Sequence, residues 1–469
     1  MDARRAKTVT LVATILGSGI ALLDGTIVNV ALPAIQNDLG GGLAGQQWVV
    51  NAYLLTLGSL ILIGGSLGDL YGERRVFALG VAGFGVASVL CALAPTIETL
   101  VAARALQGVT SALLTPASLA LIATTFEDEK ERGAAIGTWT AWGGIAAVIG
   151  PLAGGQIVDV TTWRWIFGVN VPFVAVTLVL IYLAVERETV TERKGRRIDV
   201  VGAVLTALGL AGPVFALVEQ PKRGWTSPVV LAGLFGGALL LAAFVAWERR
   251  SRDPMLPPGL FRSRNFSFTN VETLLVYAGL SSLFFFLTIF LQTVAGYSAL
   301  KSGLAGVPIT ILLFFLSGRI GGLAGRFGPR LFMGAGPLIS AVGVLMLVRL
   351  DESVGYFADL LPAMIVFGIG LALTVAPLTA TVMAEAHRGD SGIASGINNA
   401  VARVAGLLGI AVVGVAVAGR SGAELNLSGF RLGMVLTAVL LGLGGLIGLL
   451  GIRNPPLAHA APPVVSSRP

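Results

Sequence analysis

Residues 8–32 read TVTLVATILGSGIALLDGTIVNVAL, an apolar run that carries a single charge, Asp24. At 1.5 Å per helical residue this run is long enough to cross a bilayer. Asp24 lies eight residues before Leu32, which places its carboxylate about 12 Å deep. A charge at the hydrocarbon centre costs roughly 2.5–3.5 kcal/mol and is typical of a proton relay, an ion or substrate pathway, or a partner charge. We therefore predict a functional role for Asp24, the alternative being an interfacial position.

The composition indicates a membrane protein with many spans. Hydrophobic residues make up 55% of the 469 residues and charged residues 12%, and the mean hydropathy is +0.85. Soluble domains carry about 25% charged residues. The 63 glycines suit close contact between helices in lipid. A single cysteine, Cys91, excludes intramolecular disulfides and most Cys-based metal sites.

Enzymatic chemistry finds little support in the sequence. The only two histidines, His387 and His459, fall in a predicted loop and a tail, so we expect no His-rich metal site. The sequence contains no recognisable Ser/His/Asp set, metal cluster or phosphate loop. We therefore do not expect an enzyme.

Hydropathy predicts an all-α membrane protein with fourteen spans and both termini in the cytoplasm. With this orientation the inside segments hold about three times as many Lys and Arg side chains as the outside segments, as the positive-inside rule requires. The basic charge therefore follows from topology, and no nucleic-acid partner is expected. The predicted spans are 8–32, 46–67, 76–94, 98–123, 133–158, 165–185, 198–218, 228–247, 266–293, 301–323, 330–350, 358–381, 391–418 and 429–452.

Two charged loops, around 186–197 and 248–264, divide these spans into six, two and six. A repeat supports the division, because GSLGDLYGER at 65–74 recurs as GGLAGRFGPR at 321–330, each after the second span of its half. Two parallel six-span halves are what a rocking transporter requires. The predicted domains are an N-terminal six-helix bundle (8–186), two linking transmembrane helices (198–247), a C-terminal six-helix bundle (266–452) and a disordered cytoplasmic tail (453–469).

Four motifs make the chain resemble a transporter of the major facilitator superfamily, in its fourteen-span drug:proton antiporter branch. The first is LDGTIVNVALPAI at 23–35, and the resemblance implies that Asp24 takes up a proton. We expect the side chain of Asn29 to hydrogen-bond to a neighbouring helix and Pro33 to end the span.

The second motif, GSLGDLYGERR at 65–75, resembles the superfamily loop that latches the two halves together, which implies a conformational role for Gly65, Asp69, Gly72 and Arg74. Glu127 and Asp128 are candidate partners of Arg74 and Arg75. Positive-inside anchoring is the alternative role of these arginines.

The third motif, RALQGVTSA at 104–112, places Arg104 at a depth similar to that of Asp24. An arginine beside Asp24 would favour its charged form and desolvation would oppose it, so the pair is a candidate for reversible protonation. Gln107, one turn further on, either lines a substrate cavity or bonds across helices.

The fourth motif, GTWTAWGGIAAVIGPLAGG at 137–155, resembles the antiporter motif of the fifth span. Gly150 and Gly154 give a smooth face for close packing, and Gly155 extends the small-residue cluster. Pro151 removes one backbone hydrogen bond and can kink the helix. Within the resemblance this motif implies export.

Three further side chains are candidates for the substrate cavity. Glu272 either binds a cationic substrate or a second proton, or is interfacial. Arg403 either pairs with an acid or receives an anionic substrate group. Trp142 would supply aromatic surface.

The resemblance implies a proton-coupled antiporter that exports amphipathic small molecules, such as drugs or antibiotics, from the cytoplasm by alternating access. The alternative is a proton-coupled symporter that takes up a metabolite or peptide. Neither requires a cofactor, because the proton gradient drives transport. The expected partners are a small-molecule substrate, protons and the lipid bilayer, and we expect a monomer in the cytoplasmic membrane.

Overall fold

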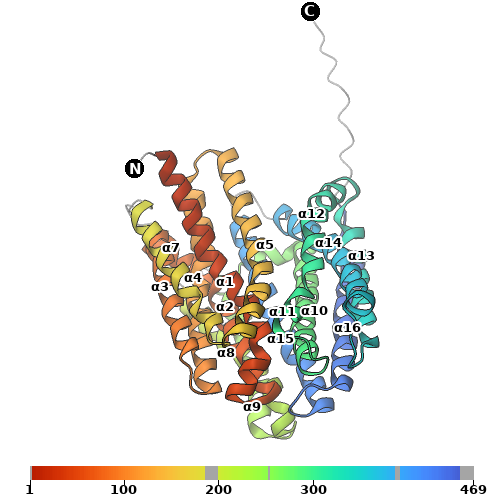
Figure 1. The fold of residues 1–469 in the computed structure, drawn as a ribbon. Coiled ribbons are helices and arrows are strands. Elements are labelled where there is room, and N and C mark those ends of the chain that lie inside the picture. The colour runs from red at the N-terminus through yellow and green to blue at the C-terminus, as the bar shows by residue number, and fades with distance from the viewer. Residues whose placement is uncertain (1–2, 185–198, 252–253, 386–390, 455–469) are drawn as a thin grey trace, which may run out of the picture.

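The computed structural model describes residues 3–184, 199–251, 254–385 and 391–454, and this part of the chain is helical with no strand (Figure 1). Fourteen of its helices or helix pairs are long and apolar enough to span a membrane, which confirms the predicted number. The tail beyond 454 and the loop 185–198 lie outside the described residues. The first half consists of α1 (Ala3–Leu39), α2 (Gly42–Tyr71), α3 (Glu73–Ala92), α4 (Ile97–Thr125), α5 (Glu129–Val160), α6 (Trp165–Gly168) and α7 (Asn170–Ala184).

The linking helices and the second half follow in the predicted order. Spans six and ten are each built from two consecutive helices, α6 with α7 and α11 with α12. The remaining elements are α8 (Val200–Arg223), α9 (Pro228–Glu248), η1 (Pro258–Arg262), α10 (Arg264–Thr293), α11 (Ala299–Leu304), α12 (Val307–Phe327), α13 (Pro329–Met346), η2 (Leu347–Arg349), η3 (Tyr356–Leu360), α14 (Leu361–Ala384), α15 (Ser391–Ser421) and α16 (Leu427–Gly451).

The first span is longer than its apolar stretch. α1 passes through Pro33 and ends at Leu39, so the interpretation of Pro33 as the end of the span is wrong. A proline removes only one backbone hydrogen bond, so the helix continues through Pro33 into the polar residues that follow it. The outer end of α1 therefore reaches the other half of the molecule.

Close helix contact within each half is made at glycines. A Cβ on Gly64 of α2 would lie 2.1 Å from the carbonyl oxygen of Ala112 in α4. In the second half, a Cβ on Gly336 of α13 would lie 2.7 Å from the carbonyl oxygen of Gly370 in α14. Helices approach this closely only where no side chain intervenes.

The two halves meet at the outer end of the molecule, opposite the end at which α1 begins and α16 ends (Figure 1). At the inner end α5 and α12 diverge, and a Cβ on Gly137 of α5 or on Gly322 of α12 would meet no atom within 4 Å. The two halves are thus in contact at their outer ends, and α5 and α12 are separated at their inner ends. Hydrogen bonds between the halves run from Leu43 N to Ala423 O (2.8 Å), Gln47 Nε2 to Ile410 O (3.1 Å), Gln292 Nε2 to Val30 O (3.0 Å), and Ala299 N and Leu300 N to Asp159 (2.9 and 3.0 Å).

The linking helix α8 packs against both halves. It contacts α2 of the first half and α15 of the second, and its apolar face, which includes Leu210 and Val214, clusters with Leu407 of α15. On the α2 side, Trp48 lies 6.1 Å from Phe215, measured between ring centroids. α8 therefore covers the contact between α2 and α15.

Gly64→Ala should destabilise the first half, because its Cβ would overlap a backbone oxygen that cannot move without separating α2 from α4. Overpacking of this kind costs about 1–3 kcal/mol. We expect a lower midpoint of thermal unfolding in detergent. Gly19→Ala is the matched control, because its Cβ would meet nothing within 4 Å, and equal midpoints for both variants would contradict the prediction.

Candidate functional site

Asp24 of α1 is completely enclosed, with 0% of its surface exposed. One carboxylate oxygen accepts a hydrogen bond from Nη1 of Arg104, and the two side chains form a buried ion pair. The other oxygen accepts from Nε2 of Gln107 at 2.9 Å and from Nδ2 of Asn170 at 3.2 Å. The two residues that share a predicted depth therefore lie in direct contact, and three donors complement the negative charge.

Arg104 of α4 has acceptors of its own. Its Nε donates to the backbone oxygen of Val49 at 3.1 Å and its Nη1 donates to Oε1 of Gln107 at 2.6 Å. The guanidinium carbon lies 4.4 Å from the ring centroid of Tyr53 and 5.7 Å from that of Phe167. Aromatic faces attract a cation, so Arg104 is held from several sides besides Asp24.

Two polar side chains of this network were not singled out from the sequence. Ser88 of α3 accepts from Gln107 at 2.9 Å and from Asn170 at 3.3 Å. Asn170 begins α7, directly after the break that separates it from α6. An amide in a predicted span and the motif WRWIFGVNVPF at 163–173 were the available signals for Asn170. Five spans of the first half thus contribute to one polar cluster.

The predicted cavity residues occupy different environments. Gln107 is fully buried and bonded to Asp24, so in this conformation it bonds across helices. Glu272 of α10 is also 0% exposed, and neither carboxylate oxygen has a hydrogen-bond partner among the described residues. Trp142, on the inner half of α5, is 50% exposed. Arg403 of α15 is partly exposed and lies against Gly58 of α2, where the two halves touch.

Arg74 does not pair with Glu127 or Asp128 in this structure. Its Nη2 lies 3.4 Å from the backbone oxygens of Ile181 and Tyr182, at the end of α7. Arg330, the corresponding residue of the repeat, donates from Nε to the backbone oxygen of Leu449, near the end of α16, at 2.6 Å. In each half, the arginine of the repeated loop therefore joins the start of the third span to the end of the sixth.

The other residues of this loop shape the turn. Gly72 joins α2 to α3 with φ of 92°, and Gly328 joins α12 to α13 with φ of 84°. Both values favour glycine. Gly65 lies near Pro116 of α4, and Asp69 lies in the last turn of α2.

The small residues of the fourth motif face two different helices. A Cβ on Gly150 would lie 2.2 Å from Thr26 Oγ1, and a Cβ on Gly154 would lie 2.3 Å from Ile27 Cγ1. Thr26 and Ile27 both belong to α1. A Cβ on Gly155 would lie 2.5 Å from Cα of Leu300, at the start of α11. Pro151 contributes a second contact, because its oxygen lies 2.6 Å from a Cβ built on Gly303. The motif thus joins α5 to α1 of its own half and to α11 of the other.

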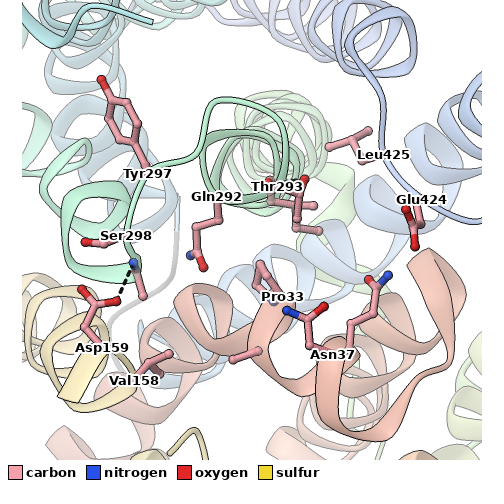
Figure 2. Close-up of a pocket in the computed structure, with 14 residues that line it drawn as sticks. Pro33, Asn37, Val158, Asp159, Gln292, Thr293, Tyr297, Ser298, Glu424 and Leu425 are labelled. Carbon is pink, nitrogen blue, oxygen red and sulfur yellow. Dashed lines mark hydrogen bonds between the residues drawn. The ribbon is translucent and has the colours of Figure 1, made fainter. Parts of the chain in front are cut away.

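A cavity of about 480 Å³ lies beside this contact, at the outer ends of α1, α5, α10 and α15 (Figure 2). Asn37 and Gln292 line it from opposite halves, with Glu424 at its edge. The carboxylate of Asp159 turns toward the start of α11 and accepts the N–H groups of Ala299 and Leu300. An acidic side chain at a helix N-terminus is a favourable charge–dipole contact, and here it joins the two halves. Among the described residues no cluster of His, Cys, Asp and Glu could hold a metal ion.

Arg104→Gln should destabilise the protein by about 3–5 kcal/mol, because it leaves the Asp24 carboxylate buried without a countercharge. The double variant Asp24→Asn/Arg104→Gln should recover part of this loss, because no unpaired charge remains. Thermal or denaturant unfolding of all four members of the double-mutant cycle measures the coupling. Strictly additive effects would contradict a direct interaction.

Asp159→Asn should raise the fraction of molecules whose outer contact is open by about two- to five-fold. The reason is that the charge at the start of α11 stabilises the closed contact by about 0.5–1 kcal/mol. Ser302→Cys, in a Cys91→Ser background, is a suitable reporter because Ser302 is only 4% exposed. The measurement is its labelling rate with a membrane-impermeant maleimide. Glu424→Gln is the control in the same cavity, and an equal rise for both variants would count against the Asp159 contact.

Comparison with known proteins identifies the family. Residues 14–410 match the family model of the Major Facilitator Superfamily. The chain is 40% identical to the puromycin resistance protein pur8 of Streptomyces alboniger, over 88% of this chain and 82% of that protein. It is 37% identical to the multidrug resistance protein Stp of Mycobacterium tuberculosis, over 90% and 78%.

The fold agrees with this assignment. A bacterial homologue of the human lysosomal transporter Spinster, solved in an inward-facing and unoccupied conformation, is 17% identical, with a TM-score of 0.68 over 95% of this chain and 97% of that chain. With fourteen candidate spans, the protein is a multi-pass protein of the cell membrane. The chain belongs to the Major Facilitator Superfamily.

Proposed function

We propose that this protein exports amphipathic small molecules across the cytoplasmic membrane in exchange for protons, with Asp24 as the proton-binding group. The observation that carries the proposal is the enclosed Asp24–Arg104 pair. A buried pair of this kind costs desolvation energy, so its place inside an apolar first half calls for a function. Proton uptake and release at Asp24 would supply one.

The surroundings of Arg104 suit a site with two charge states. When Asp24 takes up a proton, the ion pair is lost and the guanidinium needs other acceptors. The backbone oxygen of Val49, the side-chain oxygen of Gln107 and the face of Tyr53 already contact it. Arg104 therefore keeps hydrogen bonds in either state, which lowers the cost of protonating Asp24.

The position of Asp24 on α1 suits coupling to the outer contact. One and a half turns beyond Asp24, the backbone oxygen of Val30 accepts from Gln292 of the other half at 3.0 Å. Between these two positions, Thr26 and Ile27 pack against the glycine face of α5, which itself touches α11. A shift of α1 on protonation would thus act on two contacts that close the outer end. A proton can bias a two-state equilibrium by as much as its affinities for the two states differ.

The printed names of the relatives support the direction of transport. The 40% and 37% identical proteins are a puromycin resistance protein and a multidrug resistance protein. A membrane transporter confers resistance by moving a toxic molecule out of the cell, and a further relative, 34% identical, is named a tetracenomycin C resistance and export protein. These names favour export over uptake. The substrate would enter from the inner end, where α5 and α12 diverge and the side chain of Trp142 is exposed.

Asp24→Asn should reduce proton-coupled efflux by about ten-fold or more, because the amide cannot take up a proton while it preserves the size of the side chain. The assay uses inverted membrane vesicles, a panel of fluorescent substrates and puromycin. It records substrate-driven proton release with a pH-sensitive dye. A ten-fold loss corresponds to about 1.4 kcal/mol.

Asp38→Asn is the matched control. Asp38 lies on the same helix and also forms an ion pair, with Arg164, but 46% of the Asp38 side chain and 37% of the Arg164 side chain are exposed, and exposed pairs contribute little. Its variant should transport normally. Normal substrate-driven proton release by Asp24→Asn would refute the role of Asp24, and accumulation driven by an inward proton gradient would indicate symport instead of export.

A further inference from the structure

The charges within the spans do not balance between the two halves. In the first half, the carboxylate of Asp24 accepts hydrogen bonds from Arg104, Gln107 and Asn170. In the second half the carboxyl group of Glu272 is enclosed, with 0% exposure. Neither acid is available to a partly exposed cation where the halves meet.

Arg403 is such a cation. Its Cβ lies 3.3 Å from a Cβ built on Gly58, so it stands at the contact between α15 and α2. Within the described part of the chain its guanidinium has one side-chain hydrogen bond, from Nε to Oδ1 of Asn399 at 3.3 Å, and no ion pair. An arginine stays charged in proteins, and an unpaired charge at membrane depth is costly.

The hydrogen-bond partner of Arg403 also brings donors. Asn399 offers its amide N–H₂, because its oxygen already accepts from Arg403. Arg403 and Asn399 are both partly exposed. A set of donors with a positive charge and no acid is complementary to an anion.

We propose that Arg403, with Asn399, binds an anionic group of the exported molecule, such as a carboxylate, sulfonate or phenolate. This inference rests on the proposed export function and adds a substrate class to it. Because Arg403 stands where α15 meets α2, an anion bound there lies at the seam along which the halves move.

Two dyes with one scaffold and opposite charges test the proposal: fluorescein, an anion, and tetramethylrhodamine methyl ester, a cation. Binding is measured by fluorescence anisotropy on the full-length protein in phosphatidylcholine nanodiscs. Arg403→Gln should raise the Kd of fluorescein by about ten-fold or more and that of the cationic dye by less than about two-fold, because only the anion loses a charged hydrogen bond. Arg403→Lys should retain part of the affinity, because it keeps the positive charge.

Arg420→Gln is the control, because Arg420 lies on the same helix but at its exposed outer end. Equal losses for both dyes, equal effects of Arg420→Gln and Arg403→Gln, or no binding of fluorescein by the wild type would overturn the anion site. Fluorescein binding that disappears in nanodiscs containing phosphatidylglycerol would also overturn it, because the anion would then be a lipid headgroup.

Transport assays separate this inference from the proposed function. Arg403-dependent binding of fluorescein without proton-coupled efflux would contradict export and leave the anion site standing. Proton-coupled efflux of fluorescein that is indifferent to Arg403→Gln would leave export standing and refute the anion site.

Discussion

Close contact between helix backbones holds this molecule together, because hydrocarbon outside the protein is as apolar as the side chains within it. Helix packing must therefore provide the stability that the hydrophobic effect provides in the core of a soluble protein. Gly64 against α4 and Gly336 against α14 show how this is achieved within each half. The same device operates between halves, where Gly155 of α5 rests on the start of α11. Contacts of this kind require no interlocking side chains, so they can separate and re-form without repacking a core.

Polar groups are used differently in the two halves. In the first half they converge on one enclosed cluster in which Asp24, Arg104, Gln107 and Asn170 satisfy one another. In the second half Arg403 stands at the seam, and none of the ion pairs among the described residues includes it. The first arrangement suits a small ion that arrives by way of hydrogen bonds, and the second suits a larger ligand. The proposed proton site and the proposed substrate site therefore lie in different halves.

Much of the fold could be predicted from the sequence, because spans are long apolar runs and the repeat at 65–74 and 321–330 marks equivalent positions. Depth along a span was sufficient to predict Asp24 and Arg104 as a candidate pair. It could not show which way a side chain faces, because these helices are apolar on every side and lack the periodicity that distinguishes faces in soluble helices. Glu272 was therefore a candidate for the cavity, although it lies enclosed in its own half. The acceptors of Arg74 were missed for another reason, since they are backbone oxygens, which no residue type marks.

The packing of α8 has a consequence for how lipophilic molecules reach the protein. Because α8 covers the middle and outer part of the contact between α2 and α15, where Trp48 meets Phe215, a molecule dissolved in the outer leaflet that approaches from that side meets three packed helices. On the side of α5 and α12 the inner halves diverge (Figure 1). The two flanks of the protein therefore meet lipid differently: an added helix covers the outer part of one flank, and the two halves diverge at the inner part of the other.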